Sequence, residues 1–330
     1  MELNLPFVSI IIPCRNEEKY IRKCLDSIVF QDYPKDKLEV LIMDGMSEDG
    51  TQNIIKDYCR KFPFIKFLEN PEKFTPFGLN IGAKEAKGEI IMRMDAHAGY
   101  EKDYISKCVK YLQEYKADNV GGIIRTIPAN NTPAAKAIAA SLSSRLGVAS
   151  FFRLGSEKSR WVDTVFGGCY RCEVFKKIGY FDERMIRSQD IEFNKRLVRA
   201  GGKILLIPEI TAAYYPQSNF SGFLKHNFED GFWVTFPLKF GIKYFSLRHL
   251  IPLFFTSIFL IGFVFGIFFF WIRIIFDLFF LFYFIANFLF SFYISFKIGI
   301  IALPYIMASF FIRHFFYGLG SIWGLIKIVK

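Results

Sequence analysis

Residues 7–18 read FVSIIIPCRNEE, an apolar run that ends at a proline and is followed at once by charged and amide side chains. The same order recurs at residues 38–51, LEVLIMDGMSEDGT, where an apolar run ends at Asp44. Short apolar runs bounded by turn-forming residues indicate buried β-strands. Buried strands that alternate with helices form mostly parallel sheets with helices on both faces. These two stretches therefore predict an α/β fold.

The alternation of strand and helix patterns extends towards residue 125. Further strands are expected at 65–68, 89–94 and 120–125, in addition to those at 7–12 and 38–43. Apolar residues at helical spacing predict helices at 17–29, 49–62, 77–86, 102–115 and 188–200. In parallel sheets, ligands bind beyond the carboxyl ends of the strands. The polar clusters Pro13–Glu18, Asp44–Thr51 and Asp95–His97 each follow a strand, so we expect them to converge on one edge of the sheet.

The acids in these clusters point to a nucleotide diphosphate. An ionised carboxylate at the end of a buried strand needs a partner, and both Asp44 and Asp95 occupy such a position. Nucleobase N–H groups, ribose hydroxyls and a cation held by the diphosphate would supply such partners. For Asp49-Gly50 we favour plain turn formation. The usual phosphate loops of NTPases and dinucleotide-binding proteins are excluded, because their glycine motifs are missing after the first strand.

Five stretches, taken in order, carry a family resemblance. They are VSIIIPCRNEE (8–18), VLIMDGMSEDGT (40–51), GEIIMRMDAHAGY (88–100), VFGGCYRCEVFKKIGYFDE (165–183) and SQDIEFNKRLVRAGGKI (188–204). Through them, residues 7–215 resemble the inverting family 2 glycosyltransferases, and most of all the succinoglycan-biosynthesis type of membrane-anchored exopolysaccharide transferase. The resemblance implies a GT-A fold, an enzyme that uses nucleotide-diphosphate sugars, and a divalent cation, Mg²⁺ or Mn²⁺, as cofactor.

On the donor side, the resemblance implies that four residues after the first strand surround the uridine of a UDP-sugar: Pro13, Arg15, Asn16 and Glu17. It matches Asp44 to the acid that contacts the nucleobase or the ribose.

The resemblance makes Asp95 the first residue of the family's Asp-x-Asp motif, which meets the ribose and the metal. His97 stands where a second aspartate is usual, and is the other expected metal ligand. A neutral imidazole can bind Mn²⁺ but suits Mg²⁺ less well. The alternative is that His97 bonds only a phosphate oxygen.

On the acceptor side, the resemblance matches Gly167 and Gly168 to a small-residue turn that lines the acceptor site. Asp190 matches the acid that acts as general base, with Gln189 standing where a glutamate is common. A single carboxylate suffices to remove the proton of an acceptor hydroxyl during a displacement. The alternative is that Asp190 is an ordinary acid in the first turn of the helix at 188–200. We expect Glu192 to be structural.

The last quarter of the chain has the composition of a membrane segment. Of 41 Phe residues, 21 lie in residues 250–330, which carry five Lys or Arg and one acid; residues 1–249 carry 37 basic and 30 acidic residues. The apolar stretches 250–272 and 274–296 are each long enough to cross a bilayer, and Arg273 and Asp277 are spaced to pair. A third apolar region, 298–312 and 315–326, is interrupted by Arg313-His314. Two, three or four crossings are compatible with this pattern.

Residues 219–249 interleave aromatic and basic side chains, which predicts an amphipathic helix at the membrane surface. Nucleic-acid binding is disfavoured because a span follows directly. We therefore expect three parts: a GT-A domain at 1–218, an interfacial linker at 219–249 and transmembrane helices at 250–330. The cations Lys239, Lys243 and Arg248 and the lack of a signal-peptide pattern predict a multi-pass plasma-membrane protein with a cytoplasmic catalytic domain. The six scattered cysteines are typical of reduced thiols, and Cys169-x-x-Cys172 lacks the second pair of a zinc site.

The resulting hypothesis is a transferase that moves a sugar, from UDP, to a hydroxyl of a lipid-linked or polysaccharide acceptor in cell-surface glycan synthesis. One alternative is sugar transfer to polyprenyl phosphate, and another is an inactive membrane scaffold. The presence of both Asp95 and Asp190 argues against the scaffold. A processive synthase is disfavoured because only Trp233 remains of the Gln-x-x-Arg-Trp motif of those enzymes.

Overall fold

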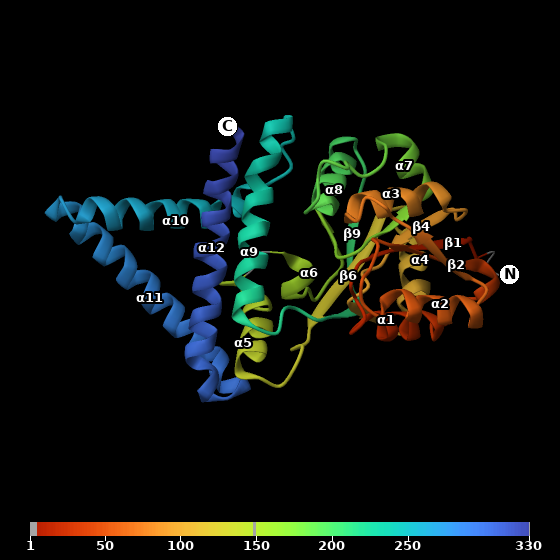
Figure 1. The fold of residues 1–330 in the computed structure, drawn as a ribbon, viewed down its shortest axis with the longest axis horizontal. Helices are drawn as coiled ribbons and strands as arrows, with labels where there is room; N and C mark the ends of the chain where they lie inside the picture. Colours follow the sequence, from red (N-terminus) through yellow and green to blue (C-terminus); the bar gives the residue numbers. More distant parts are fainter. Residues whose placement is uncertain (1–4, 148–149, 330) are drawn as a thin grey trace. The chain divides into compact units, whose positions relative to one another are not determined.

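The computed structural model describes residues 5–147 and 150–329 and divides into two compact units (Figure 1). The first, which we call the sheet unit, comprises Met1–Arg125 and Gly155–Tyr214. The second, which we call the helical unit, comprises Thr126–Leu154 and Tyr215–Lys330. Residues 1–4 of the predicted GT-A domain and the terminal Lys330 lie outside the described residues.

The centre of the sheet unit is a block of parallel strands, as the sequence predicts. Within the described residues the sheet has the order β3-β2-β1-β4-β8-β6-β9-β5, with β7 paired to β9. The parallel strands are β1 (Val8–Cys14), β2 (Leu38–Asp44), β3 (Ile65–Glu69) and β4 (Ile90–Arg93). All side chains of β2 and all of β1 except Pro13 are buried, which explains the continuous apolar runs in these strands.

Helices cover both faces of this block (Figure 1). One face carries α1 (Ile21–Val29) and α2 (Thr51–Lys61), and the opposite face carries α3 (Thr75–Glu85). The predicted helix at 17–29 begins only at Ile21, and its buried residues are Ile21, Cys24, Leu25 and Ile28. The three residues before it, Glu18–Tyr20, form a turn, which leaves the backbone N–H of Glu17 available to the neighbouring loop. A short 3-10 helix, Lys35–Lys37, leads into β2.

The other side of the sheet is antiparallel, which the strand patterns did not predict. Its strands are β5 (Ala98–Tyr100), β6 (Asn119–Thr126), β7 (Arg160–Val162), β8 (Cys169–Arg171) and β9 (Ile204–Tyr214). The helices of this side are α4 (Tyr104–Glu114), α7 (Cys172–Ile178) and α8 (Gln189–Arg199). Strand β8 pairs with β4 in the register Met92 to Cys169. This pairing brings the Gly167-Gly168 turn to the end of β4.

The helical unit packs its helices around a long C-terminal helix (Figure 1). It contains α5 (Pro133–Leu142), α6 (Phe151–Leu154), α9 (Phe220–Thr235), α10 (Leu247–Gly266), α11 (Phe270–Ile298) and α12 (Leu303–Val329), with 3-10 turns at Phe236–Phe240 and Ile300–Ala302. Ala137 of α5 shares a buried cluster with Ile306 and Phe310 of α12.

Helices α9 and α12 lie side by side at unusually short distance. A Cβ atom at Gly320 would collide with the carbonyl of Phe228, and one at Gly231 with the carbonyl of Tyr317. Thr235 Oγ1 donates to the carbonyl of Ser321 at 2.7 Å across this contact. Small residues spaced by four, here Gly320 and Gly324, allow such close helix packing in membranes. The predicted interfacial position of residues 219–249 stays a prediction.

Three helices of the described chain are long and apolar enough to cross a membrane: Leu247–Gly266, Phe270–Ile298 and Ile300–Ile328. The first two correspond to the expected spans. The third helix continues through Arg313-His314 without a break, and the number of membrane crossings stays a prediction. Arg273 Nε and Asp277 Oδ2 pair at 3.7 Å, as their spacing predicts.

Candidate active site

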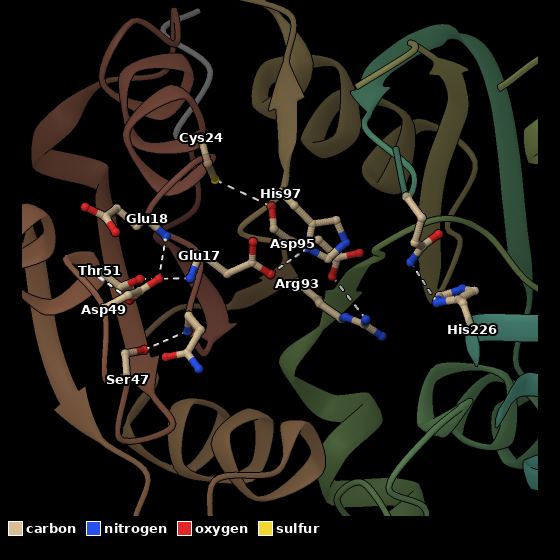
Figure 2. A network of polar contacts seen from close by, with 12 residues as sticks. Glu17, Glu18, Cys24, Ser47, Asp49, Thr51, Arg93, Asp95, His97 and His226 are labelled. Carbon is tan, nitrogen blue, oxygen red and sulfur yellow. Dashed lines mark hydrogen bonds and ion pairs between the residues drawn. The ribbon is translucent and has the colours of Figure 1, made fainter. Parts of the chain in front are cut away.

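The loops that follow β1 and β2 are joined by hydrogen bonds, as expected for clusters that converge on one edge (Figure 2). The backbone N–H of Asn16 donates to Ser47 Oγ at 2.9 Å, and Asn16 Oδ1 accepts from the N–H of Glu48 at 2.9 Å. The N–H of Glu17 donates to Thr51 Oγ1 at 2.8 Å. Asn16 has a left-handed backbone, φ 55°, which asparagine tolerates better than most residues.

The buried carboxylate of Asp44 receives its hydrogen bonds from the protein itself. Its Oδ2 accepts from the backbone N–H of Ser47 at 2.9 Å and from Gln52 Nε2 at 2.7 Å, and its Oδ1 accepts from the Ser47 hydroxyl. The need for a partner, which pointed to a nucleotide, is therefore met by Ser47 and Gln52. Asp44 holds the loop after β2 in shape, and its contact with a nucleoside stays a prediction.

Glu17 and His97 form a close pair between the first and the third cluster (Figure 2). Glu17 Oε1 lies 2.9 Å from His97 Nδ1, and the imidazole also packs edge-on against the ring of Tyr214, 5.6 Å between centroids. Because Nδ1 is engaged, Nε2 is the ring atom left to meet a ligand. A carboxylate that binds one imidazole nitrogen commonly orients the ring for a metal ion on the other.

The surroundings of His97 change the pKa of its imidazole. Burial alone would lower the pKa of the imidazole, but the hydrogen bond to Glu17 and the negative charges of Glu17 and Asp95 outweigh burial. The pKa of His97 is therefore raised above its ordinary value. Because a metal ion binds only the neutral imidazole, a cation at Nε2 would compete with the proton there.

Arg93, the last residue of β4, links the two acids on which the predicted chemistry depends. Its Nη2 donates to Asp95 Oδ1 at 3.0 Å, and its Nη1 lies 3.6 Å from Asp190 Oδ2. The arginine side chain is 10% exposed, against 15% for Asp95 and 29% for Asp190. Burial opposes the charge of Arg93, but the two carboxylates outweigh burial and raise its pKa further above the usual range.

The helix that carries Asp190 is fixed to the sheet by a buried polar network. One turn after Asp190, Asn194 Oδ1 accepts from Asn119 Nδ2 and from the Tyr170 hydroxyl, both at 3.0 Å. Asn194 Nδ2 donates to Thr164 Oγ1 at 3.0 Å. Asn194 is completely buried and both polar atoms of its amide are hydrogen-bonded, and buried polar bonds of this kind hold an element in one position.

Glu192 behaves as a structural residue of the same helix. It is buried and pairs with Arg196, whose Nε lies 2.6 Å from Glu192 Oε1. Arg196 also donates to the carbonyls of Ile178 and Tyr180, so the pair ties α8 to the segment before it.

Gly167 and Gly168 are required by the close approach of their turn to β4. The carbonyl of Gly168 accepts from the N–H of Arg93 at 2.9 Å. Gly167 has φ +66°, and a Cβ there would lie 2.8 Å from the carbonyl oxygen of Arg93. Gly168 has φ +123°, and its Cβ would meet the Tyr170 ring. The turn thus positions Arg93, and its predicted contact with an acceptor stays a prediction.

The residues present fit a cation that is held mainly by a substrate. Among the described residues, no three His, Cys, Asp or Glu side chains lie together as a metal site. Asp95 and His97 would contribute one carboxylate oxygen and one imidazole nitrogen. Magnesium-type sites often consist of one or two protein ligands, with substrate phosphates and water completing the shell. All six cysteines are free, and their redox state stays a prediction.

The structure therefore brings four predicted site residues together, namely Glu17, Asp95, His97 and Asp190. Pro13 lies half-buried in β1, and the exposed Arg15 pairs loosely with Glu48 at 3.7 Å. Arg93 is not among the predicted site residues, because it lies inside the apolar run 89–94 that predicts the fourth strand. The signal was a charged residue inside a buried run, because such a charge needs a counter-charge.

Sequence comparison finds a family match and several curated relatives. Residues 9–179 match the family described as glycosyl transferase family 2. The dolichyl N-acetyl-alpha-D-glucosaminyl phosphate 3-beta-D-2,3-diacetamido-2,3-dideoxy-beta-D-glucuronosyltransferase of Methanococcus voltae is 35% identical over 77% of this chain and 80% of its own length. The succinoglycan biosynthesis protein ExoA of Rhizobium meliloti (strain 1021) is 28% identical over 69% of this chain and 74% of its own.

Solved structures of two glycosyltransferases share the fold. The mannosyltransferase PcManGT of Pyrobaculum calidifontis, in complex with GDP-Man and Mn²⁺, has a TM-score of 0.55 and 22% identity over 71% of this chain and 63% of that one. TarS of S. aureus, in complex with UDP-GlcNAc, has a TM-score of 0.52 and 21% identity over 64% and 59%. The chain thus spans about three fifths of each solved protein. Taken with the family match and the curated relatives, this likeness leads to one conclusion: the chain belongs to glycosyl transferase family 2 and is a glycosyltransferase with a GT-A-like fold.

Proposed function

We propose that the protein is a membrane-anchored inverting glycosyltransferase that moves a sugar from UDP to a hydroxyl group of a lipid-linked acceptor. The observation that carries this proposal is the placement of Asp95 and Asp190 on one guanidinium, 3.0 and 3.6 Å from its nitrogen atoms. A donor-side acid and an acceptor-side acid at this spacing are close enough to act on the same sugar.

The chemistry assigned to Asp190 is general-base catalysis. Its carboxylate takes the proton of the acceptor hydroxyl as that oxygen attacks the anomeric carbon from the face opposite the diphosphate. The bond between the anomeric carbon and the diphosphate oxygen breaks, its electron pair leaves with the diphosphate, and the configuration inverts. Such a base contributes typically ~10²–10⁴-fold in rate.

The donor side is assigned to the joined loops after β1, β2 and β4. Pro13, Arg15, Asn16 and Asp44 are proposed to hold the nucleoside, with Glu17 acting there or through His97. Asp95 and His97 would hold a divalent cation, which when bound neutralises charge on the diphosphate. Two solved relatives were obtained with UDP-GlcNAc and with GDP-Man and Mn²⁺, so both nucleotide classes belong in the test.

The acceptor is proposed to be lipid-linked because the catalytic fold is succeeded by apolar helices. Three helices are long and apolar enough to span a bilayer, which would hold the enzyme beside a lipid-anchored substrate. The relative from Methanococcus voltae is named for a dolichyl phosphate-linked sugar as substrate. We place the protein in the plasma membrane as a multi-pass protein with its catalytic domain in the cytoplasm, on the basis of the cations before the first span.

The test uses the full chain in lipid nanodiscs with UDP- or GDP-sugars and a divalent cation. One acceptor is a polyprenyl-diphosphate-linked sugar and the other is polyprenyl phosphate without a sugar. Nucleotide release with a disaccharide product on the lipid-linked sugar is the expected result, and Asp95→Ala should abolish it. If the sugar is transferred only to polyprenyl phosphate, the acceptor group is a phosphate and the proposed hydroxyl acceptor is wrong. Divalent-dependent nucleotide binding without any transfer would favour the scaffold instead.

A further inference from the structure

Arg93 is a positively charged side chain that is buried in the sheet. It ends a strand of four buried residues and is itself 8% exposed. Removing a charge from water is costly unless partners compensate for the lost hydration. Nη2 has such a partner in Asp95, whereas Nε and Nη1 are buried and have no hydrogen-bond partner among residues 5–147 and 150–329. Most buried polar atoms in folded proteins are hydrogen-bonded, so two unbonded donors on one guanidinium call for an explanation.

The position of Nη1 next to Asp190 explains why this donor has no hydrogen bond. Nη1 lies 3.6 Å from Asp190 Oδ2, within ion-pair range but longer than a hydrogen bond. A small shift of the Asp190 side chain would therefore convert the ion pair into a hydrogen bond. The guanidinium already holds Asp95 from its other end, and its planar fork suits two carboxylates at once.

Arg93 and Asp190 are both held by rigid parts of the sheet unit. The Gly167-Gly168 turn fixes the backbone of Arg93, because Gly168 accepts its N–H and Gly167 abuts its carbonyl. The buried bonds of Asn194 fix the helix that carries Asp190. Arg93 thus spans the gap between two elements that cannot easily move.

We propose that Arg93 is a positioning residue that sets the spacing between Asp190 and Asp95, and so aims the base at the sugar that the donor side presents. This inference rests on the proposed function, because it assumes that Asp190 is the base. Arg93 acts through Asp190 and does not itself bind the donor.

The competing role is direct contact between Arg93 and the donor diphosphate, whose oxygens would also satisfy Nε and Nη1. The two roles differ in what a substitution changes. A positioning residue affects turnover at saturating donor, whereas a diphosphate ligand affects donor binding as well.

The experiment compares Arg93→Gln, Arg93→Lys, Asp190→Asn and the double variant Arg93→Gln/Asp190→Asn in the full chain in nanodiscs. Turnover comes from nucleotide release with the lipid-linked acceptor, and donor binding comes from calorimetry without acceptor. Arg93→Gln should lower turnover by roughly 10–10²-fold, the effect of a misplaced reacting group, with unchanged donor affinity. Arg93→Lys should be intermediate, because an ammonium keeps the charge but cannot bridge both carboxylates.

The double variant is the decisive arm. If Arg93 acts through Asp190, Arg93→Gln should cause no further loss once Asp190 is Asn, since there is no base left to aim. Additive losses would overturn the inference, and so would a loss of donor affinity in Arg93→Gln. Wild-type turnover in Arg93→Gln would overturn it too. A wild-type chain that binds the nucleotide sugar but transfers nothing would overturn the proposed function, and this inference with it.

A neighbouring arginine provides the matched control. Arg171 of β8 donates to the carbonyls of Ala117 and Leu112 at 2.9 and 2.8 Å and contacts neither acid. Arg171→Gln should lower the melting temperature without changing turnover per folded molecule, and it should add normally to Asp190→Asn. Non-additivity of Arg171→Gln with Asp190→Asn would mean that general loosening of the sheet explains the Arg93 result.

Discussion

Replacing Gly167 by alanine should damage both the stability and the activity of the sheet unit. The backbone of Gly167 is left-handed, φ +66°, which costs an L-residue about 1–2 kcal/mol. The new Cβ would also lie 2.8 Å from the carbonyl oxygen of Arg93, a distance at which backbone must shift. Overpacking of this kind costs about 1–3 kcal/mol in addition.

Gly201→Ala separates these two costs. Gly201 is also left-handed, φ +80°, but no atom of the residues that the structure describes lies within 4 Å of its Cβ position. It therefore carries the conformational cost without the collision. The expected difference between the variants is about 1–3 kcal/mol, which in a unit of this size corresponds to a melting temperature roughly 2–12 °C lower for Gly167→Ala.

Thermal unfolding of the full chain in detergent, together with nucleotide release, checks this prediction. Gly167→Ala should melt below Gly201→Ala and should also lose turnover, because displacement of Arg93 disturbs the link between Asp95 and Asp190. Gly201→Ala should keep its turnover. Equal melting temperatures for the two variants, or full turnover in Gly167→Ala, would refute the argument that this turn positions Arg93.

Three further predictions concern other parts of the molecule. Glu17 raises the pKa of His97 in the folded protein. Protonated His97 therefore stabilises the fold at pH values below the pKa of the unfolded state, and this stabilisation is lost as pH rises through the raised pKa. Glu17→Gln should lower the pKa of His97 in an NMR titration, and this variant should be less stable than the wild type only at low pH. His97→Asp should retain activity and shift the metal preference towards Mg²⁺, since carboxylate oxygen suits that cation; an unaltered preference in a metal titration would remove His97 from the metal. In the helical unit, Gly320→Leu must push α12 away from the carbonyl of Phe228 and should lower the stability of the unit by at least about 1–3 kcal/mol. Proteolysis of this variant should be faster than that of the control Leu325→Phe, which adds bulk on an exposed face.

The parallel half of the fold could be predicted because its strands are long and buried on both faces. The runs at 7–12 and 38–43 match β1 and β2 except for Phe7, which precedes β1; β1 extends two residues further, to Cys14, and β2 one residue further, to Asp44. In the antiparallel half, β6 was expected at 120–125, but its pairing direction was not, and the eleven-residue β9 was not predicted. Strands β5, β7 and β8 have three residues each, too few to show a period. These short strands exist because neighbouring strands offer unpaired backbone groups, which is tertiary information.

The candidate site was predictable to a similar extent. Strand ends identified Asp44 and Asp95, and the resemblance added His97 and Asp190. The sequence could not reveal that Glu17 bonds His97, since these residues are 80 positions apart. Nor could it reveal that Ser47 and Gln52 satisfy Asp44, because the course of a loop decides which side chains reach a buried acid.

The proposed mechanism depends on Asp190 as the base that activates a hydroxyl acceptor. The most direct test is turnover of Asp190→Asn with a lipid-linked acceptor, measured beside its affinity for the donor. Asparagine keeps the shape and reach of the side chain but cannot take the proton, so turnover should fall by ~10²–10⁴-fold at unchanged donor affinity. Near-normal turnover, or loss of donor binding in the same variant, would contradict the account.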